Sequence, residues 1–206
     1  MELDRQNDDT IWRDAIEIDE FTRIPYHFVF DVKFNGRQKA RLVAGGNHTT
    51  PPKEDIYSGV VGIESICIGL LIAELNGLQV CAADIGNAFL YGKTKEKVMI
   101  RAGKEFGAYM ADKILIVDKS LYGLRSSSAR FHDHLSSKLR RMGFTPTKAD
   151  PDLWIKDCGT HYEYIARYID DVLAFGKDAL KIIQEIQKDY ILEGIGRPEY
   201  YLGGMS

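Results

Sequence analysis

The chain has 206 residues, a net charge of −3, and 45% hydrophobic and 11% aromatic residues. This length and composition exclude a disulfide-stapled miniprotein and a disordered tail, and they predict one large or two small packed domains. Three widely spaced cysteines, Cys67, Cys81 and Cys158, exclude a self-contained disulfide framework. The acidic N-terminus and the short apolar runs argue against a signal peptide and a membrane span. We therefore expect a soluble protein that is not secreted.

Charge is unevenly distributed along the chain. Residues 1–20 hold eight acidic and two basic side chains, whereas residues 33–53 hold five basic side chains and no acidic one. Residues 119–148 hold seven basic side chains against Asp133 alone. Scattered Lys and Arg most often form solvated surface, but both basic segments would also suit a polyanion such as nucleic acid or a nucleoside triphosphate. Composition alone leaves both explanations open.

The first predicted elements are a helix and a hairpin. Residues 10–22 have the pattern of a short amphipathic helix. The aromatic and β-branched run 26–34 leads into Asn35-Gly36, a strong signal for a two-residue hairpin turn. The return strand is expected at residues 37–44.

The middle of the chain predicts a buried helix and an acidic strand end. Residues 61–75 are apolar nearly all round, which predicts a helix buried on most sides. Residues 78–85 form a short apolar run that contains Asp84 near its end. A carboxylate at the end of a buried strand needs a partner, because an unpaired buried charge is costly.

Further strands are expected at residues 98–101 and 114–117, followed by a helix over 126–142. The apolar stripe of this helix is expected to pack while its basic side chains remain displayed. The stripe consists of Phe131, Leu135, Leu139 and Met142.

The most informative stretch predicts a β-turn-β unit with two carboxylates at its tip. Residues 161–168 and 172–176 are strand-like and flank Ile169-Asp170-Asp171. A final helix is expected at 178–190, with Asp178 as its N-cap. Strands and helices mix without strict alternation, which favours an α+β fold.

Paired aspartates are common in turns, so Asp170 and Asp171 alone would indicate only an exposed turn. A third carboxylate, Asp84, also ends an apolar strand. Three carboxylates that converge at a sheet edge repel one another unless a cation lies between them. Hard divalent cations such as Mg²⁺ prefer oxygen ligands and keep positions open for phosphate.

Five segments resemble, in order and spacing, the motifs of the copia-type LTR retrotransposon reverse transcriptase. Tyr168-Ile169-Asp170-Asp171 is similar to the Tyr-x-Asp-Asp box, and residues 84–92 are similar to the first catalytic motif. Residues 39–44 resemble the fingers motif and residues 119–125 the motif that contacts template and nucleotide. Residues 201–204 resemble the start of the primer-grip hairpin. The resemblance spans about residues 12 to 204.

The resemblance implies an α+β right-hand polymerase with fingers, an antiparallel palm sheet flanked by helices, and no thumb. Residues 1–22 would be an acidic N-terminal helix or extension, and residues 23–206 the fingers and palm. These subdomains are discontinuous: the fingers cover about 23–77 and part of 98–123, and the palm about 78–97 and 124–206.

The resemblance also implies roles for individual residues. Asp84, Asp170 and Asp171 would be the catalytic carboxylates and the ligands of two Mg²⁺ or Mn²⁺ ions. The nucleotide-binding residues would be Lys39, Arg41, Ile85, Phe89 and Gly123. Within this set, Lys39 and Arg41 would meet the triphosphate. The carbonyl of Ile85 would be a further oxygen ligand of the metal ions, and the Phe89 ring would exclude a 2′-hydroxyl. Primer and template would meet Tyr168, Ile169, Arg125 and Gly203.

The implied function is an RNA-directed DNA polymerase that joins a deoxynucleotide to a primer 3′-hydroxyl by two-metal catalysis. Its partners would be an RNA template, a DNA primer and a dNTP, with no membrane. It would act in a cytoplasmic virus-like particle or in the nucleus. The integrase, thumb and RNase H regions of the polyprotein are expected to be absent from this chain.

The chain departs from the family pattern at three places that bear on template positioning. Ser126-Ser127-Ser128 lacks the usual proline, Tyr57-Ser58-Gly59-Val60 lacks a second one, and Gly45 stands where the family usually has lysine. The alternative function is therefore a catalytically inactive, truncated or decayed copy that acts at most as a nucleic-acid-binding module.

Two other kinds of site are weaker. Gly92-Lys93-Thr94 resembles the end of a Walker A loop, but five residues separate Gly86 from Gly92 where that motif requires four. The histidines lack partners at ligand spacing, so we expect no zinc. They are His27, His48, His132, His134 and His161.

Overall fold

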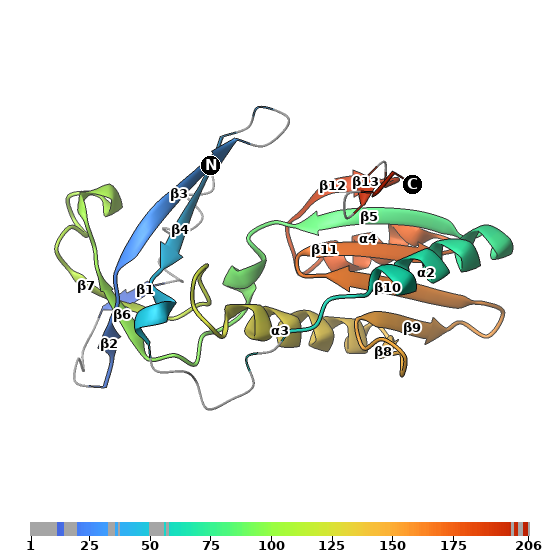
Figure 1. Ribbon diagram of the computed structural model, residues 1–206, viewed down its shortest axis with the longest axis horizontal. Helices are drawn as coiled ribbons and strands as arrows, with labels where there is room; N and C mark the ends of the chain where they lie inside the picture. Colours follow the sequence, from blue (N-terminus) through green and yellow to red (C-terminus); the bar gives the residue numbers. More distant parts are fainter. Residues whose placement is uncertain are drawn as a thin grey trace. The chain divides into compact units, whose positions relative to one another are not determined.

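The computed structural model describes residues 12–14, 20–32, 36, 38–49, 56, 58–198, 200–201 and 204–205. The chain forms two compact units, one made of Met1–Tyr57 and Phe89–His134, the other of Ser58–Ala88 and Leu135–Ser206. Each unit therefore combines two separate stretches of sequence (Figure 1). The mixture of helices and strands confirms the expected α+β class.

The first unit contains a four-stranded sheet and a hairpin. The sheet has the order β1-β7-β6-β2, and the hairpin pairs β3 with β4. Its short helices are η1 and η3, and the division of the chain falls within η2 and within the longer α3. The bounds are β1 Trp12–Asp14, β2 Thr22–Arg23, β3 Tyr26–Val32, β4 Gln38–Ala44, η1 Gly46–His48, η2 Ala88–Tyr91, β6 Val98–Arg101, η3 Lys104–Phe106, β7 Ile114–Val117 and α3 Ser127–Arg141.

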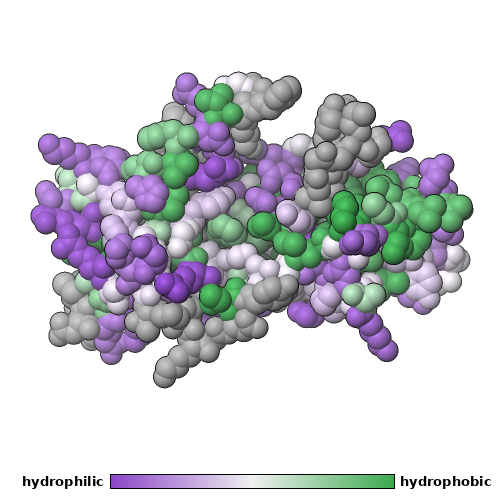
Figure 2. All heavy atoms as spheres, viewed as in Figure 1, coloured by the Kyte–Doolittle hydropathy of each residue, from purple (hydrophilic) through white to green (hydrophobic). Residues whose placement is uncertain are grey.

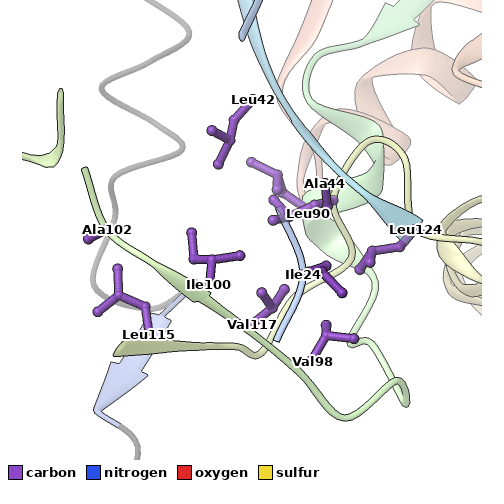
Figure 3. Close-up of a cluster of buried hydrophobic side chains, with 11 residues drawn as sticks. Ile24, Leu42, Ala44, Leu90, Val98, Ile100, Ala102, Leu115, Val117 and Leu124 are labelled. Carbon is purple, nitrogen blue, oxygen red and sulfur yellow. The ribbon is translucent and has the colours of Figure 1, made fainter. Parts of the chain in front are cut away.

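The core of the first unit is one cluster of buried aliphatic side chains (Figure 3). Ile100 on β6 and Leu115 on β7 are fully buried. Leu42 on β4 belongs to the same cluster, which therefore ties the hairpin to the sheet. Burial of such side chains stabilises the fold by roughly 1.5 to 3 kcal/mol each.

The second unit is built on a six-stranded antiparallel sheet of order β12-β5-β11-β10-β9-β8. Helix α2 packs on β5, β10 and β11, and α4 packs on β5, β11 and β12. The bounds are α2 Ile63–Asn76, β5 Gln79–Ile85, β8 Thr145–Pro146, β9 Leu153–Asp157, β10 Tyr162–Tyr168, β11 Asp171–Gly176, α4 Ala179–Gln187, β12 Leu192–Gly196, β13 Tyr200–Tyr201 and β14 Gly204–Met205.

The two helices α2 and α4 cover opposite faces of this sheet (Figure 1). Leu173 and Phe175 pack with Ile66 of α2 in one buried cluster. Gly176, which follows Phe175 and so faces the other side, lies against Ile182 of α4. A strand that is covered on both faces has a nearly continuous run of apolar residues. Such runs in the sequence therefore predicted β5 and β11.

The N-terminal helix prediction is wrong where the structure describes it. Residues 12–14 form strand β1, in which Trp12 lies opposite Val117 of β7. Thr22 and Arg23 form β2, which pairs in parallel with β6. Long-range pairing thus overrides a helical pattern of local sequence. The rest of the predicted helix, apart from residues 20–21, lies outside the described residues.

Helix α2 is correctly located but is not buried on most sides. Its inner face packs closely, since a Cβ added at Gly69 would lie 3.1 Å from the Phe175 ring. Its outer face exposes Ile68, Leu71 and, at 75% exposure, Leu75. Figure 2 shows hydrophobic side chains gathered over this helix. An all-round apolar pattern does not determine which side the fold covers.

Residues 61–77 lie in the second compact unit. They group with the second unit rather than with the β3–β4 hairpin, because α2 packs on the six-stranded sheet. Its start is fastened there too, since the Val61 amide donates to the Arg167 carbonyl at 3.0 Å.

Within the described ranges, no helix has the length and apolarity needed to span a membrane.

The stripe of α3 packs as predicted, with Leu135 and Leu139 fully buried. One of its basic side chains is not displayed, however. Lys138 is 5% exposed and its Nζ lies 2.9 Å from Asp189 Oδ2. This ion pair lowers the pKa of Asp189, mainly through the hydrogen bond from Lys138.

Candidate functional site

The strands that carry the predicted aspartates bring them to one end of the six-stranded sheet. Asp84 near the end of β5 lies directly opposite Asp171 at the start of β11. On its other side, Asp84 lies opposite Glu193 of β12. Directly opposed residues point to the same face, so three acidic side chains form a row across three strands. This row lies on the face covered by α2.

A tight turn presents the fourth carboxylate. Tyr168 pairs with Asp171 across the hairpin, which leaves Ile169 and Asp170 as its two central residues. The Ile85 amide donates to the Asp170 carbonyl at 2.8 Å and fastens the turn to β5. Ile169 has φ +53°, which is unfavourable for a β-branched residue. Strain of this kind is concentrated at functional sites.

The donor set at this edge fits a hard divalent cation. Like charges on directly opposed residues destabilise a sheet, and a cation bound among them removes that cost. Among the described residues, Asp84, Asp170 and Asp171 do not form a group whose ligand oxygens all lie within 4.8 Å of one another. Carboxylate oxygens are the ligands that Mg²⁺ and Mn²⁺ prefer.

In the first unit, Tyr122 brings two of the predicted nucleotide-binding residues together. The guanidinium carbon of Arg41 lies 5.6 Å from the centre of the Tyr122 ring. The Phe89 ring lies 4.8 Å from the same ring at an angle of 60°. Arg41 and Phe89, 48 positions apart in the sequence, therefore contact one aromatic side chain.

The loop that carries Tyr122 is fixed to the end of β4 by its backbone. The Ala44 amide donates to the Tyr122 carbonyl at 2.7 Å. Gly123 has φ +89°, and a Cβ there would lie 2.1 Å from the Ala44 carbonyl oxygen. Only glycine fits this position. Arg125 Nε donates to the Gly46 carbonyl at 3.1 Å, so this predicted template residue also anchors the loop.

Lys39 and Arg41 lie on β4 as the hairpin prediction requires. Both are near Asp31 of β3: Lys39 pairs with it in register, and Arg41 Nη1 lies 3.9 Å from its carboxylate. These cations therefore form a mixed-charge face rather than a purely basic one. Gly203 lies outside the described residues.

The triple serine that replaces the family proline is integrated into the first unit. The Ser126 amide and hydroxyl both donate to Glu96 Oε1, at 2.9 and 2.6 Å. The other oxygen of Glu96 accepts a hydrogen bond from Thr49 at 3.2 Å. Ser126 is thus bound to Glu96 by two hydrogen bonds just before α3.

Sequence reasoning missed two residues of these arrangements. Glu193 is the acidic neighbour of Asp84, but strand pairing between residues 109 positions apart leaves no local signal. Tyr122 stands beside Gly123 in the motif of residues 119–125, and an aromatic residue next to a required glycine could have indicated it. Both are revealed by register and ring contacts.

Comparison with known proteins extends these observations. Residues 11–204 match the family described as "Reverse transcriptase (RNA-dependent DNA polymerase)". The chain is 32% identical over 183 residues to the truncated transposon Ty1-A Gag-Pol polyprotein of Saccharomyces cerevisiae. The same identity relates it to the Ty1-LR2 and Ty1-ML2 Gag-Pol polyproteins of that yeast. These matches cover 86% of this chain but only 15%, 10% and 10% of the three relatives, respectively.

Proposed function

The chain belongs to the reverse transcriptase (RNA-dependent DNA polymerase) family, in its copia-type LTR retrotransposon branch, and we propose that it is the fingers and palm of an RNA-directed DNA polymerase. The fingers correspond to the first unit and the palm to the second. The observation that carries the proposal is the register of Asp84 opposite Asp171, with Asp170 in the adjoining turn.

In the proposed reaction, the primer 3′-hydroxyl attacks the α-phosphorus of a dNTP. A new phosphodiester bond forms, the bond to pyrophosphate breaks, and the hydroxyl proton passes to solvent water. Asp84, Asp170 and Asp171 would hold two divalent cations, which supply activation of the hydroxyl and neutralisation of the leaving charge. The backbone contact between Ile85 and Asp170 keeps the turn and β5 in one geometry.

The residues around Tyr122 bind the incoming nucleotide in this proposal. Lys39 and Arg41 meet the triphosphate, a role that suits a point charge and a planar fork. Phe89 lies against the sugar, where an apolar ring cannot pair with a 2′-hydroxyl and so favours dNTP over NTP. Its position is held by the Tyr122 and Phe131 rings. Gly123 permits close approach of the backbone.

Primer and template are the remaining proposed partners. Tyr168 and Ile169 at the hairpin tip, Arg125 and Gly203 contact them. Basic residues of segments 33–53 and 119–148, apart from the buried Lys138, meet the phosphate backbone, which predicts affinity that falls as salt rises. The chain spans a small part of the polyproteins it matches. Its place in the cell would therefore be that of the complete polyprotein. We propose a virus-like particle in the cytoplasm, or the nucleus.

Primer extension tests the proposal. The wild-type chain is incubated with a DNA primer annealed to an RNA template, all four dNTPs and Mg²⁺ or Mn²⁺. We expect extension by the wild type and a loss of at least about a thousandfold in Asp170→Asn, because a metal ligand is removed. Asp178→Asn is the matched control, since asparagine caps a helix as well as aspartate does and the site is elsewhere.

Two outcomes would overturn the catalytic proposal. One is extension that survives Asp170→Asn. The other is no extension by the wild type, although it binds the primer–template in a salt-dependent anisotropy titration. The second result would establish the alternative, a nucleic-acid-binding module without catalysis.

A further inference from the structure

A second group of potential ligands surrounds the β9–β10 hairpin turn. Cys158 and His161 flank the two central residues Gly159 and Thr160, and the Cys158 amide donates to the His161 carbonyl at 2.9 Å. Gly159 has φ +79°, as a tight hairpin turn requires at its first central position. Cys158 and His161 are thus opposed across the hairpin, and Glu163 follows two residues later on the face of His161.

The ligand atoms of these three residues converge. The Cys158 thiol, one His161 ring nitrogen and one Glu163 carboxylate oxygen all lie within 4.8 Å of one another. His161 Nε2 and Glu163 Oε1 are 3.8 Å apart. Neighbouring ligands around tetrahedral Zn²⁺ are about 3.3 to 3.7 Å apart, given its bond lengths of about 2.0 to 2.3 Å. Small side-chain movements would therefore complete the geometry.

The histidine is already oriented for a cation. His161 Nε2 is buried and has no hydrogen-bond partner among the described residues. The other ring nitrogen, Nδ1, lies 3.1 Å from the Thr160 hydroxyl. With the proton on Nδ1, the Thr160 hydroxyl accepts a hydrogen bond from it, and Nε2 keeps its lone pair 3.8 Å from Glu163 Oε1. A metal-bound imidazole is held in the same way by a partner for its second nitrogen.

We propose that Cys158, His161 and Glu163 form a three-residue site for Zn²⁺. A thiolate, an imidazole and a carboxylate are the ligands that zinc combines, and the thiolate disfavours Mg²⁺ and Ca²⁺. The second oxygen of Glu163 lies 3.6 Å from Lys156 Nζ, which orients the carboxylate while leaving Oε1 for the metal.

A pocket beside the three residues would give room for a fourth ligand. All three residues line a cavity of about 740 Å³ together with residues of α3 and α4. Zinc sites with three protein ligands keep such a position for water or another small ligand. The site joins the two strands of the hairpin across its turn, so zinc would hold the β9–β10 end of the sheet together.

This site is separate from the aspartates. Glu163 and Tyr168 lie near opposite ends of β10, about 17 Å apart at 3.3 to 3.4 Å per residue. Glu163 also faces the α4 side of the sheet, since it lies against Gly176, whereas Asp171 faces the α2 side. The zinc proposal therefore stands or falls independently of the polymerase proposal.

Cobalt substitution tests the site. The chain is stripped with a chelator and titrated with Co²⁺ in excess Mg²⁺, which occupies carboxylate-only sites. We expect one equivalent to give a thiolate-to-cobalt charge-transfer band and strong visible bands, all lost on adding Zn²⁺. Cys158→Ser should abolish the charge-transfer band, and His161→Asn should weaken Co²⁺ binding at least about tenfold. Cys67→Ser and His27→Asn, at exposed positions, should change neither.

A second measurement uses the unaltered chain and so does not depend on folding of the variants. Zn²⁺ should slow alkylation of Cys158, measured by mass spectrometry, and should leave the rate at exposed Cys67 unchanged. Alkylation of Cys158 at the same rate with and without Zn²⁺ overturns the proposal. A wild-type cobalt spectrum without the charge-transfer band also overturns it. A charge-transfer band that remains in a folded Cys158→Ser variant does the same.

Discussion

Asp84 of β5 and Asp171 of β11 lie directly opposite each other on neighbouring antiparallel strands. Glu193 of β12 lies opposite Asp84 on its other side. Opposed acidic side chains lower the stability of a sheet by roughly 0.2 to 1 kcal/mol per pair. Their presence at this edge is therefore a cost to folding that a bound cation would offset.

Asp84→Asn should stabilise the chain when divalent cations are removed. The amide keeps the shape of the side chain but eliminates repulsion from Asp171 and Glu193, so we expect the free energy of unfolding to rise by about 0.5 to 1 kcal/mol in EDTA. Mg²⁺ should stabilise the wild type more than the variant. Urea denaturation measures both effects, with Asp178→Asn as control. A variant less stable than the wild type in EDTA would contradict the repulsion argument.

Ile169→Gly should also stabilise the fold. A β-branched residue at φ +53° costs roughly 1 to 2 kcal/mol, and glycine adopts this backbone conformation freely. We expect the urea midpoint to rise. Ile191→Gly, at a similarly exposed isoleucine that has no positive φ, should lower it. Equal losses in both variants would show that the turn is not strained.

Gly123→Ala and Gly36→Ala separate two costs of adding a methyl group. Both glycines have positive φ, +89° and +78°, which alanine disfavours. The free energy of unfolding should therefore fall by about 1 kcal/mol in both variants for this reason alone. At Gly123 the new Cβ would also lie 2.1 Å from the Ala44 carbonyl oxygen, whereas at Gly36 it would have no atom of the described residues within 4 Å. We expect Gly123→Ala to lose at least about 2 kcal/mol more in thermal or urea unfolding. A smaller difference would mean that the loop moves away from β4 easily.

Tyr26 should make stability depend on pH at the alkaline end. Burial, and then the hydrogen bond it donates to Glu105, raise the pKa of Tyr26 from 10.0 to about 12. Because the pKa is raised in the folded chain, this contribution is complete below about pH 10 and is lost as the pH rises through 12. Unfolding curves of Tyr26→Phe should therefore fall less steeply with pH over that range. Tyr109→Phe, at a highly exposed position, is the control and should match the wild type.

The hydrogen bond between Tyr26 and Glu105 should also make stability depend on pH in the acidic range. The hydrogen bond from Tyr26 lowers the pKa of Glu105 below 4.5. Its contribution is present above pH 4.5 and declines as the pH falls through the lowered value. Tyr26→Phe should remove this dependence as well, and an unchanged acid limb would contradict the assigned contact.

Much of the local structure was predictable from the sequence because its causes are local. Alternating aromatic and β-branched residues followed by Asn35-Gly36 predicted the β3–β4 pair, and the stripe that includes Leu135 and Leu139 predicted the buried face of α3. The aspartate pair between two apolar runs predicted the β10–β11 turn. Turn chemistry and side-chain periodicity act over a few residues, so these features can be read without the rest of the chain.

The remaining features were decided by contacts between distant residues. Trp12 joins a strand because β7 is available to pair with it, and Leu75 is exposed because the sheet covers only one face of α2. Lys138 is buried because Asp189 lies beside it.

The sequence by itself determined the family and predicted the strands that carry Asp84, Asp170 and Asp171. Only the tertiary structure decided that Glu193 lies beside Asp84, that Tyr122 joins Arg41 to Phe89, and that Cys158 lies opposite His161. The physical reason is that strand register and side-chain contact depend on which segments the whole chain brings together, and local sequence does not encode that choice.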